Sequence, residues 1–142
     1  MRALLDVNVL LALFDTAHVH HRRARGWWTA HGSAGWASCP LTQNGFVRII
    51  SKPGYAHPIR LHVALASLAT QIAQSDHQLW PDDISIADEQ TFDRTYLLGS
   101  NLITDIYLLA LAVKNGGRLV TFDRALPHKA VRGAEAHHLV VV

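Results

Sequence analysis

Three aspartates in this chain occupy positions that suggest acid chemistry. Asp6 interrupts the apolar run MRALLDVNVLLALFD, Asp105 opens the apolar segment DIYLLALAV, and Asp123 follows RLVTF. A carboxylate beside a buried strand costs free energy unless it is paired, hydrogen-bonded or bound to a metal. Three carboxylates in one crevice repel one another, and a hard divalent cation with oxygen ligands relieves that repulsion. The pattern therefore points to a divalent-cation site.

Short apolar runs alternate with segments of helical periodicity, which predicts a parallel sheet covered by helices. We expect strands at 2–6, 35–39, 77–80, 118–123 and 138–142. We expect helices at 7–14, 18–32, 40–51, 59–74, 87–99 and 104–117, with a loop at 52–58. The last of these helices ends at two glycines, as a left-handed cap requires. The predicted fold class is α/β: one domain over residues 1–142, with a mostly parallel central sheet flanked by helices on both faces.

The predicted elements bring the three aspartates together. Ligands of open α/β sheets bind in the crevice beyond the carboxyl ends of the strands, and Asp6 and Asp123 each follow a strand. Asp105 opens a helix, whose N-terminus favours a negative charge. That helix precedes the strand before Asp123, so its start lies near the same edge. Taken singly, each residue has a simpler explanation: a helix N-cap for Asp6, a turn for Asp123 and helix electrostatics for Asp105.

Four segments of the sequence resemble a known family. LLDVNVLLALF, CPLTQNGFVRII, TDIYLLALAV and LVTFDRAL, in this order and spacing, are similar to the PIN domain and, more narrowly, to the VapC toxins of bacterial toxin–antitoxin pairs. The resemblance spans nearly the whole chain. It implies a metal-dependent ribonuclease with a parallel central sheet and an acidic cluster that binds Mg²⁺ or Mn²⁺. It also implies a cognate VapB-type antitoxin that blocks the site, and a homodimer.

The resemblance implies a role for each aspartate. Asp6 matches the first metal-binding aspartate of the family, Asp105 the later one and Asp123 the last acidic position. Metal held by Asp6 and Asp105 would activate a water and neutralise charge on an RNA phosphate. Asp123 would complete the cluster or orient the water. The implied activity is that of an endoribonuclease, with one or two metal ions.

Three polar residues match positions that support this cluster. Asn8 matches the polar residue two places after the first aspartate, and Thr121 matches the small hydroxyl residue two places before the last. The Thr121 hydroxyl is expected to help position the phosphate. Gln43 stands where the family typically has a glutamate, so we expect lower affinity for divalent cations. The rival interpretation is a catalytically weakened PIN module that binds RNA or antitoxin without efficient turnover.

Basic residues outside this cluster are candidates for contacts with RNA phosphates. Arg48 and Lys52 lie on or just past the helix that carries Gln43. Arg22 and Arg25 share a predicted helix face with His18, because residues three and four apart are neighbours. A solvated helix face explains these side chains equally well. The net charge of +2 with a pI near 9 favours an anionic partner only weakly.

The segment WPDDISIADEQTFD holds five of the eleven acidic residues, and we interpret it as a solvated loop and helix face rather than a second metal site. Trp36 and Trp80, in or beside apolar strands, are expected in the core. Other function classes lack their motifs. An aspartyl phosphatase usually has a second acid where Asn8 stands, and neither GxGxxG nor GxxxxGK[ST] occurs.

The localisation of the protein is predicted from the absence of disulfide, membrane-span and signal-peptide patterns in the sequence. Cys39 is the single cysteine, so no intrachain disulfide forms. No stretch approaches the roughly 20 apolar residues of a membrane span. Polar residues break the N-terminal apolar run, and no small-residue cleavage site follows it. We therefore expect a cytoplasmic protein without a membrane partner.

Overall fold

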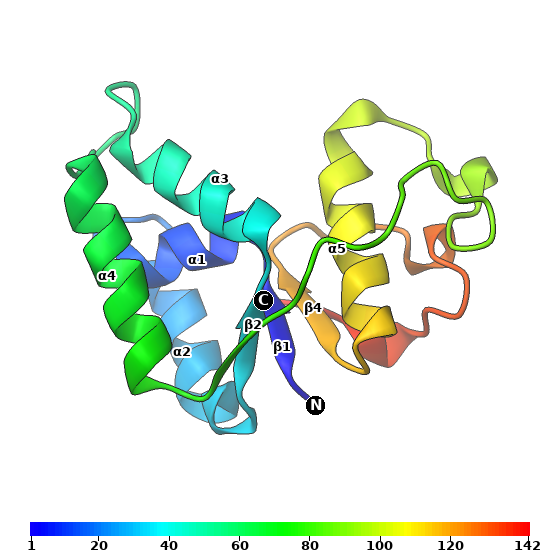
Figure 1. Ribbon diagram of the computed structural model, residues 1–142, viewed down its shortest axis with the longest axis horizontal. Helices are drawn as coiled ribbons and strands as arrows, with labels where there is room; N and C mark the ends of the chain where they lie inside the picture. The colour runs from blue at the N-terminus through cyan, green and yellow to red at the C-terminus, as the bar shows by residue number, and fades with distance from the viewer.

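The computed structural model describes residues 1–142, which are built around one five-stranded sheet (Figure 1). Its strands are β1 (Ala3–Leu5), β2 (Trp36–Ser38), β3 (His77–Leu79), β4 (Arg118–Thr121) and β5 (Leu139–Val141). They lie in the order β3-β2-β1-β4-β5, and every pairing is parallel. The predicted α/β class with a parallel sheet is confirmed, and the last strand, whose place the sequence left open, lies at an edge.

The five α-helices cover both faces of the sheet, as predicted. They are α1 (Val7–Phe14), α2 (His21–His31), α3 (Pro40–Ser51), α4 (Leu61–Gln74) and α5 (Ile103–Lys114). Helices α1 to α4 form the layer on one face, and α5 with the irregular segments around it forms the other (Figure 1). None of these helices combines the length and the apolar character that a membrane crossing requires.

The strands alternate between two apolar cores. Leu4 and Leu119 pack on the side of α5, whereas Leu5 and Val120 pack on the side of α1 to α4. Successive strand side chains point to opposite faces, and both faces of the central strands are covered, so β1 is apolar throughout. The edge strand β3 is instead polar at His77 and Gln78 and partly exposed. The two tryptophans predicted in the core, Trp36 and Trp80, are 1% and 5% exposed.

The order of the strands creates a reversal between β1 and β4. From β1 the chain proceeds outward through β2 to β3, and it then returns to the other side of β1 to form β4 and β5. Such a topological switch point leaves a crevice at the carboxyl ends of the two central strands. Residues that directly follow β1 and β4 therefore meet at the place where this fold class binds ligands.

The predicted helix at 87–99 is wrong, because local side chains satisfy the backbone there instead. Asp88 accepts hydrogen bonds from the Gln90 backbone N–H (2.9 Å) and the Thr91 hydroxyl (2.7 Å), and Asp93 accepts from the Thr95 backbone N–H (3.0 Å). Short polar side chains that bond to nearby backbone compete with helix formation. Only a short 3₁₀ helix, Arg94–Tyr96, forms in this segment.

Helix α2 begins three residues later than predicted. His18 lies in the turn before the helix, where its Nδ1 accepts a hydrogen bond from the His20 backbone N–H (3.0 Å). The expected strip of His18, Arg22 and Arg25 along one helix face is therefore incorrect. The end of α5 agrees with expectation, since Gly116 has the positive φ (65°) of a left-handed residue.

Candidate active site

Asp6 lies at the centre of the candidate site, between the end of β1 and the start of α1. Its backbone N–H donates to the Val120 carbonyl (3.0 Å), which fixes it beside β4. The residue is only 3% exposed. It occupies the N-cap position of α1, yet its side chain makes no capping hydrogen bond. Helix capping therefore accounts for its carboxylate only through the nearby backbone N–H groups of Val7 and Asn8, which act to lower its pKa.

Thr121 connects Asp6 to Asp123 across the switch point. Its fully buried hydroxyl donates to Asp6 Oδ2 (3.2 Å), and its oxygen accepts from the Asp123 backbone N–H (3.1 Å). Both hydrogen bonds are internal, and no part of the hydroxyl reaches the surface. The hydroxyl thus links Asp6 to the backbone of Asp123. Its expected contact with a phosphate stays a prediction.

Asp123 and Asp105 approach Asp6 from two other elements. Asp123 is half-buried after β4, where one carboxylate oxygen accepts from the Ala125 backbone N–H (2.7 Å), so the turn explanation holds for that oxygen. Asp105 is half-buried in the first turn of α5. Burial, and then repulsion from Asp6 and Asp123, raise the pKa of Asp105 to about 7. Asp6 and Asp123 thus lie near enough to Asp105 for their charges to act on it.

The pKa of Asp6 is raised as well, and burial is the largest cause. The Thr121 hydroxyl and the backbone N–H groups of Val7 and Asn8 act in the opposite direction, and the charge of Asp123 adds to the rise. No lysine, arginine or histidine forms an ion pair with any of the three aspartates. The site therefore gathers negative charge that the protein itself does not neutralise.

The carboxylate oxygens of the three aspartates are of the kind that a hard divalent cation prefers, but they are not arranged around one point. No three Asp, Glu, His or Cys side chains lie close enough together to hold a metal ion as they stand. A shared ion would require the three carboxylates to lie closer together than they do here. Carboxylate oxygens are the ligands that Mg²⁺ and Mn²⁺ prefer, and no protein cation competes for them here.

The structure does not bring the other two polar candidates into contact with the aspartate side chains. Asn8 is exposed, and only its backbone acts on Asp6. The Gln43 amide nitrogen donates to the Ser38 hydroxyl (2.9 Å), whose oxygen is 2.8 Å from His77 Nε2. Sequence reasoning missed Ser38 and His77, and the available signal was a serine inside the otherwise apolar strand GWASC. The Gln43 amide oxygen accepts no hydrogen bond from the protein, whereas its nitrogen is bound to Ser38.

The basic candidates divide between two places. Arg48 and Lys52 line a groove of about 610 Å³ between α3 and α4, and Gln43 lies in the same groove. Arg22 and Arg25 are exposed on α2, and Arg25 borders a different cavity. Only the first pair thus shares a surface with a predicted site residue.

Comparison with known proteins agrees with this architecture. The family model of the PIN domain matches residues 3–132. Ribonuclease VapC44 of Mycobacterium tuberculosis is 51% identical over 142 residues, which is the full length of both chains. Ribonuclease VapC39 of the same organism is 43% identical over 134 residues, covering 94% of this chain and 96% of the relative.

A solved structure supports the fold independently. The crystal structure of VapC20 from Mycobacterium tuberculosis, described as a sarcin-ricin loop cleaving toxin, superposes with a TM-score of 0.58. The match covers 82% of this chain and 85% of the other at 11% identity, so it speaks to fold alone. The family match and the fold define a PIN-domain protein, and this chain belongs to that family. Within the family, full-length identity places it among the VapC toxins.

Proposed function

We propose that this chain is the toxin of a type II toxin–antitoxin pair and that it acts as a divalent-metal-dependent endoribonuclease. The observation that carries the proposal is the cluster of Asp6, Asp105 and Asp123 at the switch point, with no protein cation to neutralise it. The naming of the relatives as ribonucleases supports RNA as the substrate.

Each residue of the site has a role in this proposal. Asp6, Asp105 and Asp123 hold Mg²⁺ or Mn²⁺. A bound divalent cation neutralises phosphate charge and lowers the pKa of a water molecule, which is the chemistry that phosphodiester hydrolysis requires. Thr121 keeps Asp6 and Asp123 in register through its two hydrogen bonds. Arg48 and Lys52 bind the RNA backbone along the groove between α3 and α4.

The partners belong to the same proposal. A cognate VapB-type antitoxin covers the site and inhibits cleavage, and the toxin forms a homodimer. Membership of the VapC group supports both. Light scattering measures both assemblies directly, on the purified toxin alone and after mixing with its antitoxin. A toxin that stays monomeric and does not bind the antitoxin contradicts this part of the proposal.

Cleavage of total cellular RNA tests the activity. Purified protein is incubated with RNA in the presence of Mg²⁺, Mn²⁺ or a chelator, beside the Asp6→Asn and Gln43→Glu variants. We expect metal-dependent cuts that Asp6→Asn abolishes. Faster cleavage by Gln43→Glu would show that the missing carboxylate limits metal binding, because added carboxylates raise the affinity of a site for a divalent cation.

The control and the rival interpretation use the same assay. Asp88→Asn removes an exposed carboxylate from a loop outside the site and leaves cleavage unchanged. Absence of cleavage under every condition, even with glutamate at position 43, would favour the weakened PIN module that binds without turnover. That alternative rests on Gln43, which stands where the family typically has a glutamate and whose amide nitrogen donates to the Ser38 hydroxyl.

A further inference from the structure

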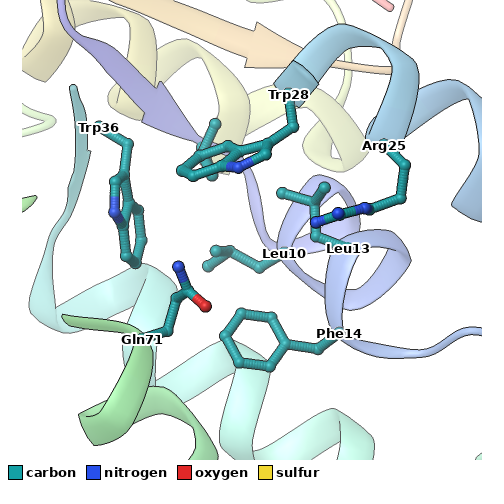
Figure 2. Close-up of a pocket in the computed structure, with 8 residues that line it drawn as sticks. Leu10, Leu13, Phe14, Arg25, Trp28, Trp36 and Gln71 are labelled. Carbon is teal, nitrogen blue, oxygen red and sulfur yellow. The ribbon is translucent and has the colours of Figure 1, made fainter. Parts of the chain in front are cut away.

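We propose that a cavity between α1, α2, α4 and the sheet is a binding site for a small aromatic carboxylate. The cavity has a volume of about 240 Å³ (Figure 2). Its lining comes from strands β1 and β2 and from all three helices, and it contains none of the three aspartates of the candidate active site. The proposal is therefore independent of the proposed nuclease activity.

The walls of the cavity are apolar and largely aromatic. They are formed by the side chains of Leu5, Leu10, Leu13, Phe14, Trp28 and Trp36. Trp28 and Trp36 meet edge to face, with ring centroids 6.2 Å apart, and the Trp36 indole N–H donates to the Ser75 hydroxyl (2.8 Å). These contacts hold the rings in place around the space. Walls of this kind suit the faces and edges of an aromatic ligand.

Two polar side chains converge on this apolar space. Figure 2 shows the Gln71 amide reaching from α4 into the cavity between Trp36 and Phe14, and the Arg25 guanidinium extending along its border from α2. Neither side chain forms a hydrogen bond within the protein, and no acid lies within ion-pair distance of Arg25. A guanidinium pairs best with a planar carboxylate, and an amide completes its recognition.

The size of the cavity selects the ligand class. An apolar cavity of about 150 Å³ stays dry and binds benzene. A cavity of about 240 Å³ therefore accommodates a bicyclic ring system with a short acidic group. A nucleobase fits the walls less well, because one amide cannot satisfy its several polar edge atoms and unpaired polar groups are costly in an apolar site.

Paired probes test both halves of the proposal. Isothermal titration measures the binding of 2-naphthoate and of its neutral isostere 2-naphthamide to the full-length protein. We expect 2-naphthoate to bind about tenfold more tightly, because it makes a charged hydrogen bond that the amide lacks. Arg25→Gln should remove this preference while 2-naphthamide binding persists. The matched control Arg22→Gln, an exposed arginine on the same helix, should retain it.

Location in the cavity is tested separately. Two of the four tryptophans line the cavity, so the indole N–H resonances of Trp28 and Trp36 should shift on titration while that of Trp80 stays in place. Leu13→Phe fills part of the space from a half-buried position and should weaken both probes. Failure of both probes to bind at millimolar concentration, equal affinity for the two, or an unchanged preference in Arg25→Gln overturns the proposal.

Discussion

Two groups of acidic residues in this protein have opposite electrostatic environments. The carboxylate cluster consists of Asp6, Asp105 and Asp123. The acidic loop consists of Asp82, Asp83, Asp88, Glu89 and Asp93. In the acidic loop every carboxylate has a partner: Asp83, Glu89 and Asp93 form ion pairs at 2.9, 2.5 and 3.6 Å, and Asp82 and Asp88 accept hydrogen bonds.

The pKa values follow these environments. Hydrogen bonds from threonines and backbone N–H groups lower the pKa of the exposed Asp88 and of the half-buried Asp93. Burial and mutual repulsion raise the pKa of Asp6 and Asp105. Acidic residues in a loop are thus ordinary surface chemistry, whereas the cluster maintains an unfavourable arrangement of charge. Carboxylates whose pKa is raised by burial and by like charges are candidates for functional sites, because a bound cation would relieve the repulsion.

The largest predicted difference between the two groups is in catalysis. Asp105→Asn should lower RNA cleavage by about 100-fold or more, a loss typical for a group that acts directly at the reacting phosphate. The same change should raise the melting temperature of the metal-free protein, because it removes a repelled, half-buried charge. Asp88→Asn should leave cleavage unchanged and lower stability slightly. Equal activity of the two variants would contradict the contrast.

A smaller effect is expected from the residue that positions the cluster. Thr121→Val keeps the side-chain shape but removes the hydrogen bonds to Asp6 and to the Asp123 backbone. Loss of an outer-shell partner typically costs about 10–100-fold in metal affinity or activity. The buried polar groups left without a partner should cost about 1–3 kcal/mol of unfolding free energy. Denaturant titration and cleavage assays measure the two effects.

Thr121→Ser separates positioning from packing. Serine retains the hydroxyl that bonds Asp6 and loses only a methyl group, so cleavage should return close to the wild-type rate. The apparent affinity for Mn²⁺, taken from the metal dependence of cleavage, should follow the same order, with valine weakest. If valine cleaves as well as serine, the hydroxyl has no role in arranging the site.

The pH dependence of stability should distinguish the cluster from the loop. Asp105 has a pKa of about 7 in the folded protein and an ordinary value near 3.8 when unfolded. Between these values the folded state binds the extra proton, so stability falls as the pH rises through the window. Lowered pKa values, as for Asp88 and Asp93, act in the opposite sense and at lower pH.

Melting curves of metal-free wild type and Asp105→Asn, recorded from pH 4 to 8, isolate this contribution. His18 and His77, whose pKa values burial lowers, are present in both proteins and cancel in the comparison. Relative to the variant, the wild type should lose stability as the pH rises to about 7 and change little above it. A constant difference across the range would show that Asp105 is not strained.

The positions of the strands and α-helices and the candidate aspartates could be predicted from the sequence, because both follow from local patterns. Short apolar runs and helical periodicity predicted the positions of the strands and of all five α-helices, and the position of Asp6 and Asp123 after strands predicted that they lie at one edge of the sheet. The contacts that were not predicted join residues far apart in the sequence, and a local pattern does not reveal such contacts. Thr121 bonds to a residue 115 positions away, and the Ser38 hydroxyl and His77 meet only because β2 and β3 pair.

The segment at 87–99 failed for a related reason. Its composition suits a helix, but the backbone of Asp93 donates to Ala130 (2.9 Å) and that of Arg132 donates to Thr91 (2.8 Å). This pairing with a distant loop, with the local bonds of Asp88 and Asp93, outweighs helix propensity, which is a weak preference. The cavity bordered by Arg25 is likewise a product of packing, since its lining comes from five separate elements.

The smallest predicted effect lies at the opposite end of the helix that carries Asp105. Lys114, in the last turn of α5, pairs with Asp83 of the acidic loop at 2.9 Å, and both side chains are about half exposed (48% and 46%). A double-mutant cycle with Lys114→Met and Asp83→Asn should give a coupling of about 0.2–1 kcal/mol that salt reduces further. Cleavage should be unaffected by either change. The same helix would then carry a dispensable ion pair at its C-terminus and an indispensable carboxylate, Asp105, at its N-terminus. Solvent screens the Lys114–Asp83 pair, whereas burial reduces the screening at Asp105.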